Sequence, residues 1–198
     1  GCSNTWGWGL SDIWNIKNND QPSKYAWPQL LADKLNIRCN NLSIPGASNK
    51  EIWYNIINAK FETDDVVTIL WTYFDRYCIL QKNNTDQIGA WKTDVLSKQF
   101  FKYFYDEYDM LLNLYLLIDH VQYSLENKVK LIKHFLVFKP HEWIKNYDKD
   151  FTWNMAHPVL FLDDIDHFPK ALDKNHPGPK THEMFAEKIY NEIRNEIT

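Results

Sequence analysis

The sequence predicts a three-layer α/β/α fold in which helices cover a mainly parallel sheet. Three observations indicate this class. Residues 66–71 form a continuous, largely β-branched run, of the kind that is buried on both faces in a parallel sheet. Near the end of the chain, Phe185, Ile189, Ile193 and Ile197 recur every four residues, which is a helical spacing. Between these segments predicted strands and helices alternate, and the sequence contains no internal repeat.

The first part of the chain predicts a loop, a helix and a short strand. Residues 10–23 are polar and rich in asparagine, which is typical of a loop. Apolar residues at helical spacing then predict a helix that starts at Ser23 or Tyr25, with Ser23 as a plausible N-cap, and ends at Asn36. Residues 37–44 alternate loosely before a Pro-Gly pair, and we expect a short strand that ends in a turn.

The middle of the chain predicts helices on either side of the buried strand. Ser48, with Glu51 three residues later, resembles a capping box and predicts the start of a helix. Residues 72–93 have an irregular pattern with a turn-like stretch at 82–86. Residues 95–127 are predicted to be helical, as two helices, and we interpret them as an insertion.

The last third predicts a strand, a long loop and the final helix. Residues 128–138 are rich in branched apolar side chains and favour a second strand. Residues 142–166 lack a clear period, so we expect a loop with a short strand near 159–162. Pro179 lies near the first turn of the final helix, where proline is well tolerated.

Composition restricts the possible partners. With 198 residues, 44% of them hydrophobic, the chain is long enough to bury the core of one domain. The net charge of −4 and the absence of a basic run disfavour nucleic acid, and no apolar stretch is long enough to span a membrane. Three cysteines without CxxC spacing favour reduced thiols, although one disulfide is not excluded. No signal peptide is visible, so we expect a cytoplasmic or virion-associated protein of unknown oligomeric state.

Two short stretches at opposite ends of the chain supply the parts of a nucleophilic site. Residues 1–9 (Gly-Cys-Ser-Asn-Thr-Trp-Gly-Trp-Gly) place Ser3 in a glycine-rich turn that would expose its hydroxyl beside free backbone N–H groups. Asp173 and His176 are three residues apart in a loop rich in proline and glycine. A serine needs a base to become a nucleophile, and the base needs a partner that holds its tautomer. The three residue types together favour acyl transfer.

In their order, these stretches resemble the SGNH hydrolases, also called the GDSL-type esterase and lipase superfamily. Residues 1–5 look like the nucleophile block, residues 41–49 (Asn-Leu-Ser-Ile-Pro-Gly-Ala-Ser-Asn) like the glycine block, and residues 173–177 like the closing Asp-x-x-His block. The resemblance covers most of the chain and is greatest to bacteriophage-encoded members. It implies a flavodoxin-like sheet and a single hydrolase-like domain over residues 1–198.

The resemblance also implies roles for individual residues. Ser3 would be the nucleophile, His176 the general base and Asp173 the group that orients His176. The backbone N–H groups of Ser3 and Gly46 would stabilise the oxyanion. No cofactor or metal is implied, and the remaining histidines form no HExxH or similar ligand set.

The sequence departs from the family pattern in three places. The third block usually offers an asparagine to the oxyanion, whereas residues 71–76 (Trp-Thr-Tyr-Phe-Asp-Arg) contain none. We expect Asn49, Thr72, Tyr73 or Arg76 to substitute, or the activity to be weak, because loss of such a donor costs about 100-fold or more. Cysteine stands at position 2, where the family usually has aspartate.

The third departure concerns the strand that should carry the nucleophile. In this fold it precedes the nucleophile block and lies in the middle of the sheet, yet the sequence starts at Gly1. A missing central strand would leave backbone groups unpaired. We therefore expect residues upstream of Gly1, or a strand lent by another segment.

Several of these residues also have simpler interpretations. Ser3 alone could be a turn serine or a helix N-cap, and Cys2 could be a packing residue or an alternative nucleophile. Arg76 could bind substrate or pair with Asp75. Asp163, Asp164 and Asp166, together with His167, could attract a cation, but a solvated acidic loop is the simpler interpretation.

The surplus of aromatic residues has two interpretations as well. Most of the rings lie on helical apolar stripes, where core packing is the default. Trp6, Trp8 and Trp71 lie nearer the predicted site and are better candidates for a platform on which a sugar stacks.

Two functions remain open at this stage. The first is a serine esterase or carbohydrate deacetylase that acts on a small-molecule or glycan ester through Ser3, His176 and Asp173. The second is a catalytically weak or inactive binding module with the same fold, for example in a virus particle. The missing third-block asparagine motivates the second.

Overall fold

The computed structural model describes residues 1–16, 20–82, 84–137, 159–161 and 168–197. The chain divides into two compact units. The first comprises Gly1–Pro45 and Leu162–Thr198, and the second comprises Gly46–Phe161. The predicted loop at 142–158 and the acidic residues 163–167 lie outside the described residues.

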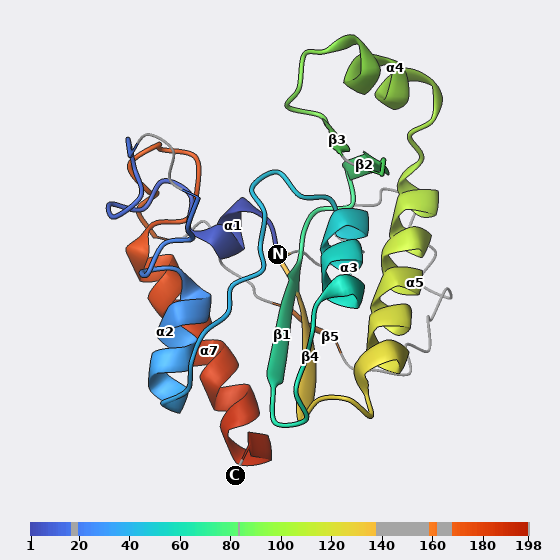
Figure 1. The fold of residues 1–198 in the computed structure, drawn as a ribbon. Coiled ribbons are helices and arrows are strands. Elements are labelled where there is room, and N and C mark those ends of the chain that lie inside the picture. The colour runs from blue at the N-terminus through green and yellow to red at the C-terminus, as the bar shows by residue number, and fades with distance from the viewer. Residues whose placement is uncertain (17–19, 83, 138–158, 162–167, 198) are drawn as a thin grey trace. The chain divides into compact units, whose positions relative to one another are not determined.

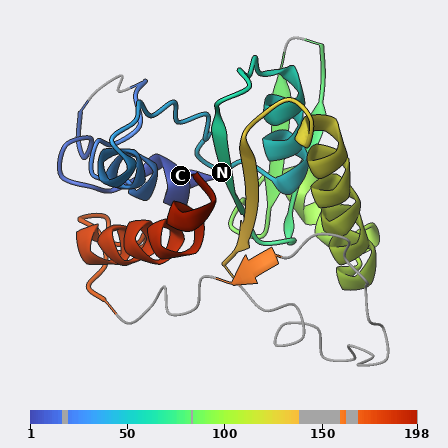
Figure 2. The same cartoon turned by 90° about the horizontal axis from the view of Figure 1, so that it is seen from below.

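The first unit is helical in its described part. It contains α1 (Ser3–Trp6), α2 (Trp27–Leu35) and α7 (Pro179–Ile197). Figures 1 and 2 show α2 and α7 side by side. The predicted stripe of the final helix explains this packing, because Phe185, Ile189 and Ile193 of α7 are all fully buried.

The second unit contains the parallel sheet. Its strands β1 (Val66–Trp71), β4 (Leu131–Leu136) and β5 (Val159–Phe161) are ordered β1-β4-β5, with Val66 opposite Leu131 and His134 opposite Val159. A separate antiparallel pair, β2 (Arg76–Leu80) and β3 (Thr85–Gly89), follows β1. The predicted α/β class with a parallel sheet is confirmed. In the described part of the sheet β1 has a strand neighbour on one side, so the expected additional strand stays a prediction.

Helices of the second unit cover one face of this sheet. α3 (Asn49–Asn58) and α5 (Glu107–Leu125) lie on the same face in both views, and α4 (Val95–Tyr103) precedes α5. Two helices within residues 95–127 were predicted, and both are present. α5 lies between the parallel strands β1 and β4 in the chain, which is the position of a crossover helix. The interpretation of 95–127 as an insertion stays a prediction.

Two predictions about local structure are wrong. Ser23 does not cap α2: its hydroxyl donates to Asp12, and the N-cap is Ala26. Residues 37–44 form no strand, although the Ile44 N–H donates to the Gly1 carbonyl over 3.1 Å. The irregular stretch after β1 contains the hairpin β2–β3.

The predicted cap of α3 is present. Ser48 is fully buried, and its hydroxyl accepts the Glu51 backbone N–H over 3.2 Å. We expect Ser48→Ala to lower the free energy of unfolding by about 1 kcal/mol, since one N–H of the first turn loses its partner. Urea unfolding of Ser48→Ala beside Ser124→Ala, a substitution inside α5, tests this. Equal stability of the two variants would contradict the cap.

Candidate active site

Ser3 lies at the start of α1. The expected turn is a single helical turn whose N-cap is Cys2 and which ends at Gly7 in the left-handed conformation. The N–H groups of Thr5 and Trp6 donate to the Cys2 carbonyl over 2.9 and 3.0 Å. Ser3 is the first helical residue, so its own N–H is not used within the helix. Its side chain is buried, with 6% of the residue exposed.

Asp173 and His176 lie in a closed loop just before α7. The Ala171 N–H donates to the His176 carbonyl over 2.9 Å, and the backbones of Lys170 and Pro177 form an isolated antiparallel β-bridge. Inside the loop, Asp173 Oδ1 accepts the backbone N–H groups of Asn175 and His176, each over 3.0 Å. These bonds determine which oxygen of Asp173 is left for the imidazole of His176.

Ser3, His176 and Asp173 come together within the first unit. His176 Nε2 lies 3.0 Å from Ser3 Oγ, and His176 Nδ1 is hydrogen-bonded to Asp173 Oδ2. The aspartate side chain is 8% exposed and the histidine side chain 26% exposed, so one edge of the site reaches solvent. Sequence reasoning named all three residues, and their catalytic role remains a prediction.

Charge and hydrogen bonding favour an ionised Asp173. Burial raises the pKa of this carboxyl, but the backbone N–H and ring of His176 and the N–H of Asn175 outweigh burial and hold it below its ordinary value. With Asp173 ionised, the proton of a neutral imidazole lies on Nδ1, and Nε2 is left to accept the hydroxyl proton of Ser3. The arrangement can therefore deprotonate Ser3.

Apart from Ser3, the predicted oxyanion residues belong to the second unit. Asn49 and Thr72 bond to each other there: Asn49 Oδ1 accepts the Thr72 N–H over 2.8 Å, and Asn49 Nδ2 donates to the Thr72 carbonyl over 3.0 Å. One N–H of the Asn49 amide remains beyond this pair. Gly46 has a φ of +79°, a left-handed conformation in which any other residue would be strained, and this explains a glycine at that position. The role of these residues toward an oxyanion stays a prediction.

Tyr73 and Arg76 follow the end of β1. The Arg76 guanidinium lies over the rings of Tyr73 and Trp91, with centroid distances of 5.8 and 4.7 Å. Burial raises the pKa of Asp75, and the neighbouring Arg76 charge opposes that rise. Arg76 thus has aromatic as well as acidic neighbours, and both interpretations of it, substrate contact and ion pairing, stay open.

The alternative residues differ in their surroundings. Cys2, Cys39 and Cys78 are not in disulfides, and Cys2 is buried as the N-cap of α1. Trp71 is fully buried, and its Nε1 donates to His134 Nδ1 over 3.1 Å, so its interpretation as a stacking platform is wrong. Trp8 is 43% exposed and Trp6 is half-buried.

His182 is the residue of this region that sequence reasoning missed. It lies in the first turn of α7, is 1% exposed, and accepts the Trp27 N–H at Nδ1 over 3.1 Å, which caps α2. Burial lowers its pKa to about 4, the charge of His176 acts in the same direction, and the Pro177 carbonyl opposes both. One signal was available, because His182 is three residues before Phe185 and so continues the buried stripe of α7.

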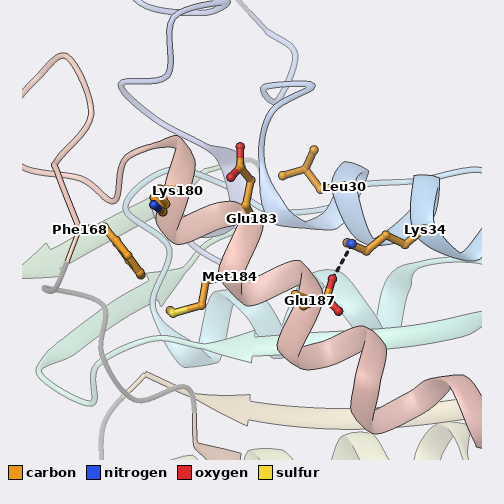
Figure 3. Close-up of a pocket in the computed structure, with 7 residues that line it drawn as sticks. All are labelled: Leu30, Lys34, Phe168, Lys180, Glu183, Met184 and Glu187. Atoms are coloured by element: carbon orange, nitrogen blue, oxygen red, sulfur yellow. Dashed lines mark hydrogen bonds and ion pairs between the residues drawn. The ribbon is translucent and has the colours of Figure 1, made fainter.

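A groove of about 580 Å³ lies elsewhere in the first unit, between α2 and α7 (Figure 3). Two of its lining residues, Lys34 and Glu187, form an ion pair with 2.5 Å between Nζ and Oε2. Lys180 Nζ lies 5.6 Å from the centre of the Phe168 ring. The full lining is Leu30, Lys34, Phe168, Lys180, Glu183, Met184 and Glu187. None of the three predicted catalytic residues belongs to it.

Among the described residues no group of three or more histidine, cysteine, aspartate or glutamate residues is placed to hold a metal ion. Within the same ranges, every helix is too short or too polar to cross a membrane.

Comparison with known proteins supports the fold class. No protein-family model matches the sequence, and no curated protein matches it significantly. One solved structure is similar: "Structure of a putative lipolytic protein of G-D-S-L family from Desulfitobacterium hafniense DCB-2". The likeness covers 96% of this chain and 95% of that chain, with a TM-score of 0.50 and 12% sequence identity. At this identity the likeness concerns the fold alone, which is α/β with a parallel sheet.

Proposed function

We propose that the protein is a serine hydrolase that cleaves a carboxylic ester through an acyl-enzyme. One observation carries the proposal: His176 Nε2 lies 3.0 Å from Ser3 Oγ while Nδ1 of the same ring bonds to a mostly buried aspartate. This is the spacing at which a base can take the proton of a nucleophilic hydroxyl. The similar G-D-S-L structure supports the choice of reaction class.

The proposed reaction has two steps. Ser3 Oγ attacks the ester carbonyl as its proton moves to His176 Nε2, and the imidazolium is stabilised by Asp173. The C–O bond to the alcohol breaks, and His176 returns the proton to the departing oxygen. Water then attacks the acyl-Ser3 ester, His176 again takes and returns one proton, and the acid is released with free Ser3.

Stabilisation of the oxyanion is assigned to the backbone N–H groups of Ser3 and Gly46. Asn49 and Thr72 are proposed to add to it, with Tyr73 and Arg76 contacting the substrate. The guanidinium of Arg76 and the neighbouring rings of Tyr73 and Trp91 can offer polar and stacking contacts to a small-molecule or glycan ester.

A fluorophosphonate probe tests the proposal. It should form a covalent adduct on the peptide that contains Ser3, detected by mass spectrometry, because an activated serine attacks phosphorus as it attacks an acyl carbon. Ser3→Ala should not be labelled, and it should lose turnover of short-chain p-nitrophenyl esters and acetylated sugars. Cys2→Ala should still be labelled. Unchanged turnover in Ser3→Ala, or labelling that depends on Cys2, would refute the assignment of Ser3.

The second candidate is a binding module with little or no catalysis, for example in a virus particle. It is favoured by the missing third-block asparagine together with the use of Asn49 by the Thr72 backbone. In that case the wild-type protein would be folded but neither labelled by the probe nor active on any ester of the panel.

A further inference from the structure

Gly9 lies against the carboxylate of Asp173. Its φ is +84° and the residue is buried. A Cβ placed on Gly9 would lie 2.8 Å from both Cγ and Oδ1 of Asp173 and 3.0 Å from Cβ of Ala171. The two separations from Asp173 are shorter than real Cβ contacts and that from Ala171 is tighter than most, so any side chain at position 9 would force the loop or the carboxylate to move.

The same residue also holds the loop in place. The Leu172 N–H donates to the Gly9 carbonyl over 3.0 Å. Gly9 therefore anchors the backbone next to Asp173 and leaves the space that the Asp173 carboxyl occupies. Both effects act next to Asp173, whose carboxylate holds the imidazole of His176.

The loop around Asp173 has little freedom to retreat. Ala171 bonds to both Lys174 and His176 through the backbone, over 2.9 Å in each case. Oδ1 of Asp173, the oxygen nearest to Gly9, accepts the backbone N–H groups of Asn175 and His176. A methyl group that pushes on this oxygen must rotate the carboxylate, and rotation takes Oδ2 away from His176 Nδ1.

We propose that Gly9 is a positioning residue that sets the orientation of the Asp173 carboxylate and, through it, the imidazole of His176. Its meaning for catalysis rests on the hydrolase function proposed above. The substitution Gly9→Ala should lower kcat about 100-fold with little change in KM, since a displacement on the order of 1 Å in the catalytic groups costs about that much.

The matched control is Gly7→Ala. Gly7 is also buried with a φ of +83°, but a Cβ there would meet Ser23, Ala26 and Leu10 rather than the Asp173 loop. Both variants should lose stability through backbone strain. They should differ in the far-downfield proton NMR signal of His176 Nδ1–H, which the bond to Asp173 produces. We expect this signal to be lost or shifted in Gly9→Ala and kept in Gly7→Ala; an unmoved signal in folded Gly9→Ala overturns the proposal.

A double-mutant cycle covers the case in which Gly9→Ala is too unstable to study alone. Removing the carboxyl with Asp173→Ala should make room for the new methyl group, so Gly9→Ala should cost less stability in that background. If Gly9→Ala is unfolded by itself, a double variant that folds would support the proposal in the same way. Additive losses, or a double variant that is as unfolded as Gly9→Ala, overturn the proposal.

These readouts separate the two proposals. The NMR signal and the unfolding cycle need no substrate, so they decide the role of Gly9 even if the wild-type protein hydrolyses no ester. If the wild-type protein is active while Gly9→Ala keeps its kcat and its signal, the role of Gly9 fails and the hydrolase function stands.

Discussion

Asp173→Asn should lower kcat for ester hydrolysis about 10,000-fold and leave the protein folded. The hydrogen bonds of the loop determine this result. Oδ1 of Asp173 accepts two backbone N–H groups, and an asparagine can keep both only with its carbonyl oxygen in that place. Its NH₂ group then faces His176 Nδ1, which must accept. The ring proton moves to Nε2, opposite Ser3 Oγ, and His176 can no longer take the hydroxyl proton.

Asp12→Asn is the matched control for this substitution. Asp12 also uses both carboxylate oxygens, toward the Ser23 hydroxyl at 2.6 Å and the Lys24 N–H at 2.8 Å, but it has no role in the proposed site. Circular dichroism and steady-state kinetics of both variants check the prediction. If Asp173→Asn keeps more than a tenth of the wild-type kcat while folded, Asp173 does not set the tautomer of His176.

The parts of the fold that could be predicted are those with a strong local signal. The strand at Val66–Trp71 and the helix at Pro179–Ile197 have the predicted character because a β-branched run and a four-residue apolar repeat each bury a continuous surface. Asp173 and His176 could be paired because they are close in the chain. That Asp173 and His176 lie near Ser3 could be predicted only from the order of the sequence blocks that resemble the SGNH hydrolases, because no local pattern relates residues so far apart in the chain.

Elements whose local sequence signal is weak or misleading could not be predicted. The hairpin β2–β3 contains Asp86, which has low strand propensity, and Ile79 is 40% exposed, so the alternation of apolar and polar residues is weak. Residues 37–44 alternate, but no neighbouring strand pairs with them among the described residues. Periodicity reports the burial of side chains and not the presence of a partner strand.

The N-cap of α2 could not be predicted from the local sequence either. Ser23 has the chemistry of an N-cap, yet its hydroxyl donates to Asp12 and the helix begins four residues later. The Trp27 N–H is satisfied instead by His182, 155 positions away in the chain. When a side chain of another helix accepts the first N–H of a helix, the local sequence contains no signal of it.

Stability should fall by about 3 kcal/mol between pH 7 and pH 4 because of His182. The pKa of this ring is about 4 in the folded protein against 6.5 when free, with burial as the main cause. Between these values the unfolded chain binds more protons than the folded one, so the free energy of unfolding rises with pH. The contribution is complete above about pH 6.5 and is lost as the pH falls toward 4. A difference of about 2.5 pKa units corresponds to about 3 kcal/mol.

His182→Asn isolates this contribution from the other titrating groups. The asparagine oxygen can take the place of Nδ1 and accept the Trp27 N–H, so the cap of α2 is kept while the titration is removed. Contributions from Asp173 and from the other carboxyls are common to both proteins and cancel in the difference. Urea unfolding from pH 4 to pH 7 should show wild-type stability falling about 3 kcal/mol further than that of His182→Asn, and NMR titration should place the His182 ring near pH 4. Parallel stability curves would mean that folding does not lower the pKa of His182, and the predicted contribution of its neutral ring to stability would then be wrong.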